Sequence, residues 1–173
     1  MRDEKGMTLI ETLLVVAVAS LVLIATAAYS VPWIAREKMR SAVYDVQLYM
    51  QLARIEAVSR NQECRMVVDT SGGMLSVLDS NGTPSTSDDI VLYSRRLPDS
   101  VEFDRPDSGS AVTLPQIGAG TRYQAIFASN GTVRNGGGEV VLHGGEQYGK
   151  VSVYGAGGTQ VEKWNNGAWH VGS

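Results

Sequence analysis

Hydrophobic residues form one long uncharged run near the start of the chain. No charged residue occurs from Thr12 to Ala35, a stretch of 24 residues. As a helix at about 1.5 Å per residue this run would extend roughly 36 Å, whereas the hydrocarbon core of a bilayer is about 30 Å thick. We therefore expect a membrane-spanning helix over residues 7–35.

After this run, hydrophobic residues recur every three or four positions, as on one face of a helix. The residues that share this face are Val43, Val46, Met50, Ala53 and Ala57. Charged residues occupy mostly the opposite face. The pattern predicts that residues 36–62 form an amphipathic helix with one side packed on a core.

From Glu63 onward the pattern changes to short segments separated by glycine, asparagine, proline and serine clusters, which is typical of strands and turns. The expected strands are Cys64–Asp69, Met74–Leu78, Ile90–Tyr93, Arg122–Phe127, Glu139–His143 and Val151–Tyr154, followed by a hairpin of Val161–Trp164 and Ala168–Val171. The sequence thus predicts an α+β fold, with a long amino-terminal helix packed on an antiparallel β domain at residues 63–173.

The connections between these strands carry their own predictions. Asn81-Gly82 and Asn130-Gly131 are expected to form type I′ turns, because both central residues of that turn need positive φ. Trp164 and Trp169 are expected to meet across the last hairpin. The segment Asp104 to Gly120 is expected to be a long mobile loop.

Composition adds few constraints. A chain of 173 residues supports one compact domain with an appended element, and a net charge of -3 gives no overall attraction to nucleic acid. Cys64 is the only cysteine, so an intramolecular disulfide is excluded, and we expect Cys64 to be a small buried hydrophobe.

The uncharged run is preceded by Glu11, where an unpaired carboxylate in a membrane would be costly. A secretory signal peptide, cleaved after Ala27, is the simplest alternative interpretation of this region. However, the leader Met1 to Lys5 has two basic and two acidic residues instead of a positive charge, and Glu11 interrupts the apolar segment. These departures argue against a signal peptide.

The front of the apolar segment has a distinctive order of residues, which is Gly6-Met7-Thr8-Leu9-Ile10-Glu11 followed by Thr12-Leu13-Leu14-Val15-Val16. It resembles the class III leader junction of type IV pilins and type II secretion pseudopilins. The resemblance implies a leader peptide at residues 1–6, cleavage between Gly6 and Met7 by a prepilin peptidase, and N-methylation of Met7. It also implies that Glu11 contacts the Met7 amino group of an adjacent subunit during filament assembly.

A second resemblance covers the end of the amphipathic helix and one hairpin. The residues are Leu52-Ala53-Arg54-Ile55-Glu56-Ala57-Val58-Ser59-Arg60-Asn61 and Phe127-Ala128-Ser129-Asn130-Gly131-Thr132-Val133. They are similar to the A-R-x-E-A-x-x-R-N and F-x-x-x-G-x-V segments of GspH/FimT-type minor pilins and pseudopilins. The resemblance implies a type IV pilin-like fold and a structural subunit of a type IV pilus or a type II secretion pseudopilus, near its tip.

The resemblance also implies a location and partners. Before assembly, the chain would be a single-pass inner-membrane protein with its carboxyl-terminal domain in the periplasm, and afterwards it would lie in the filament. Its partners would be the prepilin peptidase, other major and minor pilins or pseudopilins, and an inner-membrane assembly platform. Two alternatives stay open, namely a DNA-binding minor pilin of natural transformation and an unprocessed, membrane-anchored periplasmic binding module.

We expect no catalytic site, cofactor or metal. No base, nucleophile or metal cluster accompanies Arg54 and Glu56, and the two histidines, His143 and His170, lack the spacing of a zinc site. Carboxylates between Asp79 and Asp89 have the chemistry to bind calcium. A solvated loop is favoured there, since the glycine is fourth in the motif and an EF-hand needs it sixth.

Nucleic acid binding is not expected either. DNA-binding members of the resembled group carry a basic G-R-x-R segment, where this chain reads Gly158-Thr159-Gln160-Val161-Glu162-Lys163. A basic face would need several arginines to converge, and the candidates are Arg95, Arg96, Arg105, Arg122 and Arg134.

Overall fold

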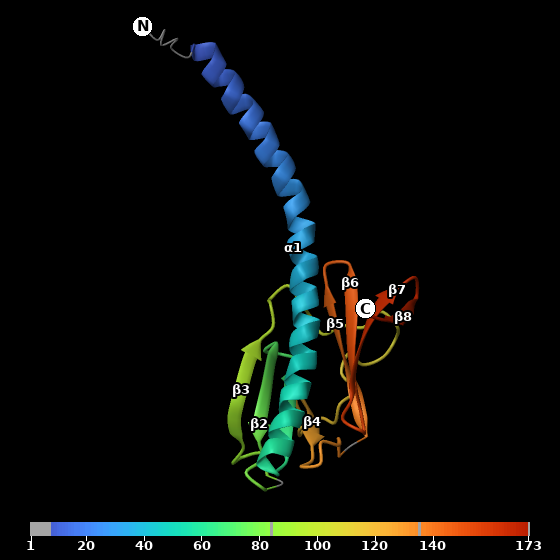
Figure 1. The fold of residues 1–173 in the computed structure, drawn as a ribbon. Helices are drawn as coiled ribbons and strands as arrows, with labels where there is room; N and C mark the ends of the chain where they lie inside the picture. The colour runs from blue at the N-terminus through green and yellow to red at the C-terminus, as the bar shows by residue number, and fades with distance from the viewer. Residues whose placement is uncertain (1–7, 84, 135, 173) are drawn as a thin grey trace. The chain divides into compact units, whose positions relative to one another are not determined.

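One long helix and eight strands make up the described part of the protein (Figure 1). The structure is a computed structural model that describes residues 8–83, 85–134 and 136–172. In chain order the elements are α1 (Leu9–Arg60), β1 (Cys64–Asp69), β2 (Met74–Asp79), β3 (Ile90–Arg96), β4 (Arg122–Phe127), β5 (Gly137–Gly144), β6 (Gln147–Tyr154), β7 (Thr159–Asn165) and β8 (Ala168–Val171). The α+β class predicted from the sequence is confirmed.

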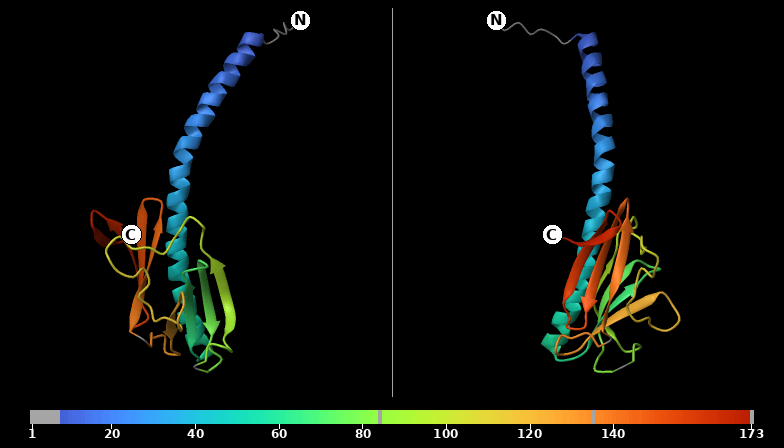
Figure 2. Two further views of the ribbon diagram at one scale, coloured as in Figure 1. Left: turned by 180° about the vertical axis from the view of Figure 1, so that it is seen from behind. Right: turned by 90° about the vertical axis from the view of Figure 1, so that its right-hand side faces the viewer.

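The chain divides into two compact units, Met1–Ala35 and Arg36–Ser173. In the second unit, the carboxyl-terminal part of α1 packs on two antiparallel four-stranded sheets, which the views in Figure 2 show beside the helix. Sheet 1 has the strand order β3-β2-β1-β4 and sheet 2 has the order β5-β6-β7-β8. Every pair of neighbouring strands is antiparallel, as expected for a domain built from hairpins.

The core lies where α1 meets the sheets. The helix face predicted from periodicity is buried, and its members are Val43, Val46, Met50, Ala53 and Ala57. Met66 and Phe127 meet this face from sheet 1, and Leu142 and Val151 meet it from sheet 2. Because side chains alternate along each strand, the intervening residues lie on the far faces of the two sheets.

Helix α1 ends in a Schellman motif built on Asn61. The Asn61 backbone is left-handed, with φ of 52°, and its N–H donates to the Val58 carbonyl at 3.3 Å. The N–H of Gln62 donates to the Ala57 carbonyl at 3.1 Å. These two bonds satisfy carbonyl groups that the last helical turn would otherwise leave unpaired, so the chain leaves the helix here and enters β1.

All eight predicted strands are present, and several are longer than predicted. Strand β3 continues to Arg96, and β5 begins at Gly137. Backbone pairing extends across these polar and glycine positions, which carry no hydrophobic alternation in the sequence.

The turn at Asn81-Gly82 has the predicted geometry. Both residues have positive φ, 48° and 72°, and the N–H of Thr83 donates to the Ser80 carbonyl at 2.8 Å. Positive φ at both central positions is the requirement of a type I′ turn. The turn lies inside the longer connection between β2 and β3 and does not join the strands directly.

The type I′ prediction at Asn130-Gly131 is wrong. Gly131 has a φ of 79°, but Asn130 is not among the residues with positive φ. The Asn130 side-chain oxygen accepts the N–H of Thr132 at 3.1 Å, and the N–H of Gly131 donates to the Ala128 carbonyl at 2.8 Å. The Asn130 side chain therefore closes the turn locally, and the Asn130 backbone is not left-handed.

The last hairpin is tight and carries the expected tryptophan pair. Asn166 and Gly167 both have positive φ, 51° and 79°, between the paired strands β7 and β8. The rings of Trp164 and Trp169 lie edge to face, with centroids 5.1 Å apart. This contact confirms the predicted meeting of the two side chains.

Candidate functional site

The amino-terminal part of α1 presents apolar side chains on all sides. Eleven large hydrophobic side chains there are between 52% and 80% exposed, and they are Leu9, Ile10, Leu13, Leu14, Val15, Val16, Val18, Leu21, Val22, Leu23 and Ile24. Apolar surface of this extent in a protein marks a region that interacts with other apolar groups. This segment is the first candidate site.

The polar groups of this segment fall into two kinds. Three hydroxyls donate to carbonyl oxygens three or four residues earlier in the same helix, and these belong to Thr12, Ser20 and Thr26. Glu11 differs, because its carboxylate is exposed in the first helical turn and has no side-chain partner within the described residues. Its backbone N–H donates to the Thr8 carbonyl at 3.0 Å.

The other predicted processing residues, Gly6 and Met7, lie outside the described residues. Over the part of the chain that the structure does describe, no helix has the combination of length and apolarity needed to cross a membrane. The membrane span over residues 7–35 stays a prediction, as do the leader at residues 1–6 and the processing site.

The carboxyl-terminal end of α1, which resembles the GspH/FimT segment, attaches the helix to sheet 1. Glu56 accepts hydrogen bonds from Arg60 Nε at 2.7 Å and from the Tyr93 hydroxyl at 2.9 Å. The bond from Arg60, followed by that from Tyr93, lowers the pKa of the Glu56 carboxyl. Arg60 Nη1 also donates to Asp79 Oδ2 at 3.2 Å. These residues therefore hold the helix end against β2 and β3, and this contact is structural.

Arg54 joins the same helix to the loops beside sheet 2. Its guanidinium lies over Gly131 and Gly157. The backbones of these two glycines are so close that a methyl group on Gly157 would overlap the carbonyl oxygen of Gly131. A side chain at Gly157 would also lie 3.1 Å from Arg54 Nε. The two segments that resemble GspH/FimT proteins thus touch each other here, although they lie far apart in sequence.

The carboxylates between Asp79 and Asp89, considered as calcium ligands, have separate partners. Asp79 pairs with Arg60, Asp88 accepts the Thr83 hydroxyl, and Asp89 pairs with Arg65. Within residues 8–83, 85–134 and 136–172, no group of three or more histidine, cysteine, aspartate or glutamate side chains is placed to hold a metal ion.

The arginines considered for nucleic acid binding are engaged by carboxylates. Four of them form ion pairs, which are Arg95 with Asp45, Arg96 with Asp99, Arg105 with Asp107 and Glu139, and Arg134 with Glu63. Each acid offsets positive charge that phosphate binding would require. The structure therefore supplies no clustered basic face from these four residues.

Two ionisable groups are buried where α1 meets sheet 1, one on β1 and one on the helix. Burial raises the pKa of the Cys64 thiol to about 11, and Cys64 is fully buried in the core as predicted. Burial also raises the pKa of the Asp45 carboxyl, while Arg95, whose Nε lies 2.9 Å from Asp45 Oδ2, opposes that effect. Sequence periodicity placed Asp45 with the solvated charges, because a partner on a distant strand has no local pattern.

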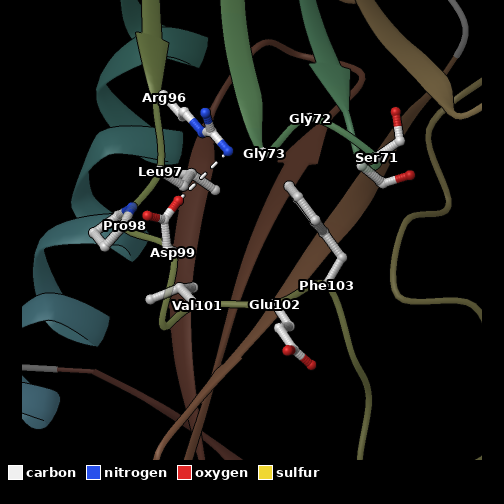
Figure 3. Close-up of a pocket in the computed structure, with 11 residues that line it drawn as sticks. Ser71, Gly72, Gly73, Arg96, Leu97, Pro98, Asp99, Val101, Glu102 and Phe103 are labelled. Carbon is white, nitrogen blue, oxygen red and sulfur yellow. Dashed lines mark ion pairs between the residues drawn. The ribbon is translucent and has the colours of Figure 1, made fainter.

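A pocket of about 420 Å³ opens at the end of sheet 1 where β1 turns into β2 (Figure 3). Leu97, Val101 and Phe103 give it apolar walls, and Arg96 lies at its rim, paired with Asp99 at 3.5 Å. Both members of this ion pair are well exposed, so the pair contributes little stability. No local sequence pattern indicates this pocket, since its lining comes from two segments that are distant in sequence, the turn at residues 70–73 and residues 96–103 at the end of β3 and beyond it.

A long amino-terminal helix with an apolar first part, packed through its second part on antiparallel sheets, defines the class of type IV pilin-like subunits. The family model for the Type II transport protein GspH matches residues 42–157, and the model for the Prokaryotic N-terminal methylation motif matches residues 1–27. The chain belongs to the GspH family of structural subunits and is a minor pilin or pseudopilin.

Solved structures share this fold. The type IV minor pilin FimU of Pseudomonas aeruginosa aligns with a TM-score of 0.51 and 18% identity, over 80% of this chain and 97% of FimU. The minor pseudopilin EpsH of the Vibrio cholerae type 2 secretion system aligns with a TM-score of 0.51 and 14% identity, over 72% of this chain and 95% of EpsH. No curated protein sequence matches the chain.

Proposed function

We propose that this chain is a processed filament subunit in which Glu11 directs assembly. A prepilin peptidase removes residues 1–6 by cutting between Gly6 and Met7 and methylates the new amino terminus. The Met7 amino group of one subunit then pairs with Glu11 of its neighbour. The subunit has no catalytic activity of its own and acts through the contacts that it makes in the filament.

The observation that carries this proposal is the state of Glu11. Its carboxylate is exposed in the first turn of α1, beside apolar side chains, and it lacks a partner within the described residues. Moving a carboxylate into an apolar environment is costly unless a cation accompanies it. Cleavage after Gly6 would create such a cation, the amino group of Met7, four residues before Glu11 in the sequence. A second subunit would bring its own Met7 amino group to Glu11.

The apolar segment supports the same route. Before assembly it would anchor the chain in the inner membrane, with the β domain in the periplasm, and an assembly platform would then move it into a filament. Lipid contacts would be replaced by packing against the helices of other major and minor subunits. Aliphatic side chains are compatible with both surroundings, because lipid tails and aliphatic helix surfaces are similarly apolar. We place the subunit near the filament tip.

Mass spectrometry of the mature amino terminus tests the processing step. We expect a chain that begins with N-methylated Met7. A chain that begins at Ala28, or that retains Met1, would refute pilin-type processing and would favour a cleaved secretory protein or an unprocessed membrane-anchored module instead.

The Glu11→Ala variant tests the pairing role. It should be cleaved and methylated normally, yet its incorporation into filaments should fall about tenfold or more, since a buried amino group would lose its counter-charge. Glu11→Gln should behave in the same way because the amide carries no charge. Glu37→Ala, which removes an exposed carboxylate farther along α1, is the matched control and should assemble normally. Normal incorporation of Glu11→Ala would refute the role of Glu11.

A further inference from the structure

Strand β3 is a long edge strand whose side chains are mostly exposed. It lies at one end of sheet 1 and pairs with β2 alone (Figure 1). Ile90 is 53% exposed and Val91 is 60% exposed, while Tyr93 is also exposed. Exposed edges with apolar side chains are sites where a further strand adds to a sheet.

The other sheet edges of the described chain are covered or short. Strand β4 is bridged on its free side by Gln116 and Val133, and β5 is bridged by Glu102 and Val112. These residues belong to loops that lie along the strands and occupy their backbone groups. The remaining edge strand, β8, has four residues. Edge pairing is therefore blocked at β4 and β5 and limited at β8, whereas β3 is seven residues long and open.

The direction of the β3 backbone groups follows from its register. The N–H of Leu97 donates to the Gly73 carbonyl at 2.8 Å, on the side of β2. In an antiparallel ladder this direction alternates from one residue to the next, so the N–H groups of Ser94 and Arg96 point to the free edge. The register shift between Val77 and Leu78 lies beyond this stretch and leaves the alternation from Tyr93 to Leu97 intact.

The charge of β3 indicates what kind of strand fits it. The strand carries Arg95 and Arg96 and no acidic residue. Arg95 is already paired with the buried Asp45, but Arg96 meets only the exposed Asp99, at 3.5 Å. A second copy of β3 offers no carboxylate to Arg96, so charge favours a different chain as the partner.

We propose that the free edge of β3 accepts an extended segment of a neighbouring pilin-type subunit. This segment carries apolar side chains beside Ile90 and Val91 and a carboxylate beside Arg96. Backbone hydrogen bonds to Ser94 and Arg96 supply the pairing, and the side chains supply the choice of partner. The inference rests on the proposed function, since it assigns to that filament a contact between β domains in addition to the helix contacts.

Two substitutions block the edge without touching the core. Ser94→Pro removes an outward N–H and leaves the pairing with β2 intact, because proline is tolerated on an edge strand whose N–H faces solvent. Val91→Lys places a charge at an exposed edge position. The matched controls are Ser94→Ala, which keeps the N–H, and Val171→Lys, at a position that is 68% exposed on β8.

The test uses the full chain and measures thermal stability, amino-terminal processing and incorporation into filaments. Ser94→Pro and Val91→Lys should be stable and processed, while their incorporation should fall about tenfold, the effect of losing roughly one interfacial hydrogen bond with its neighbours. Both controls should incorporate like the wild type. Hydrogen exchange of the amides of residues 90–96 should slow when the wild-type chain enters filaments.

The outcomes separate this inference from the proposed function. If the wild-type chain is absent from filaments, the proposed function fails, and the edge contact fails with it. If the wild type enters filaments and both edge variants enter equally well, or the amides of residues 90–96 exchange as fast as in the free protein, the inference alone is refuted. A detergent-solubilised dimer of the wild type that Ser94→Pro dissociates would identify a second copy as the partner and would overturn the assignment to a different subunit.

Discussion

Arg65 and Asp89 form a buried ion pair on the face of sheet 1 that lies away from the helix. Arg65 Nη1 is 2.6 Å from Asp89 Oδ1, and each side chain is only 3% exposed. The guanidinium also donates to the carbonyl oxygens of Ser85 and Thr83, each at 2.9 Å. One arginine on β1 thus holds the connection between β2 and β3 in place, and with it the start of β3.

Removing Asp89 should destabilise the protein strongly. Asp89→Ala leaves the charge of Arg65 buried without a counter-charge, and the Nε of Arg65 already lacks a partner within the described chain. We expect the free energy of unfolding to fall by about 3–5 kcal/mol, the usual cost of breaking a buried pair from one side. Denaturant unfolding of the detergent-solubilised protein measures this loss. Asp88→Ala, which removes the neighbouring exposed carboxylate, should change stability by less than about 1 kcal/mol, and an equal loss for both variants would contradict the role of the pair.

The effect of a substitution at Asn61 on stability should depend on how well the new residue tolerates a left-handed backbone. Its φ of 52° is left-handed, so Asn61→Gly should leave the free energy of unfolding unchanged or slightly higher. Asn61→Ala should lower it by about 1–2 kcal/mol because of the strain on its Cβ. Thermal unfolding distinguishes the two variants. Equal stability of the glycine and alanine variants would show that the helix does not depend on this terminating conformation.

The loss of folding stability caused by Arg95→Ala should depend on pH. The folded-state pKa of Asp45 is raised by burial and held down by Arg95, so removing Arg95 raises it further. A carboxyl whose pKa is higher in the folded state than in the unfolded state makes its full contribution to stability at pH values below the unfolded-state pKa. That contribution is lost as the pH rises through the folded-state pKa. Arg95→Ala should therefore lower the free energy of unfolding by about 1–3 kcal/mol at pH 7, and by progressively less as the pH approaches 4. Adding Asp45→Asn should remove this pH dependence, and a loss that is constant with pH would contradict the argument.

Cys64 should be unreactive in the folded protein. At pH 8, a pKa of about 11 in place of the ordinary 9.0 lowers the thiolate fraction about a hundredfold, and burial lowers access further. Maleimide labelling should be slow until denaturant is added. Because the folded pKa is raised, stability should be full below pH 9 and fall as pH rises from there through about 11, a dependence that Cys64→Ala should lack. Rapid labelling of the folded protein would contradict this account.

Periodicity was sufficient to find the elements of this fold. The buried face of α1, from Val43 to Ala57, repeats at helical spacing, and every predicted strand lies between turn residues that interrupt it. Glu11 was also visible in the sequence, because a carboxylate beside an uncharged run is an energetic anomaly that requires a partner. Local patterns therefore identify both the architecture and the candidate assembly residue.

The polar interior could not be predicted in the same way. Arg65 looks like an outward residue of an ordinary strand, and its burial depends on a connection that brings Asp89 back from 24 residues away. Asp45 depends on β3 in the same manner, and the turn at Asn130 depends on a side chain that competes with its backbone. Each of these features depends either on a partner that is distant in sequence or on a choice between two local hydrogen bonds. Neither cause produces a periodic pattern of residues in the sequence.

The apolar part of α1 has a consequence for how subunits find their position. Sliding one aliphatic helix along another by a turn, about 5.4 Å, exchanges one set of contacts for another of nearly equal energy. The hydroxyls of Thr12, Ser20 and Thr26 are turned to their own backbone, so they do not distinguish these arrangements. A bundle of such helices would be strongly held and poorly aligned. In the filament that we propose, the carboxylate of Glu11 would lift that degeneracy, because few of the arrangements would bring it to a cation.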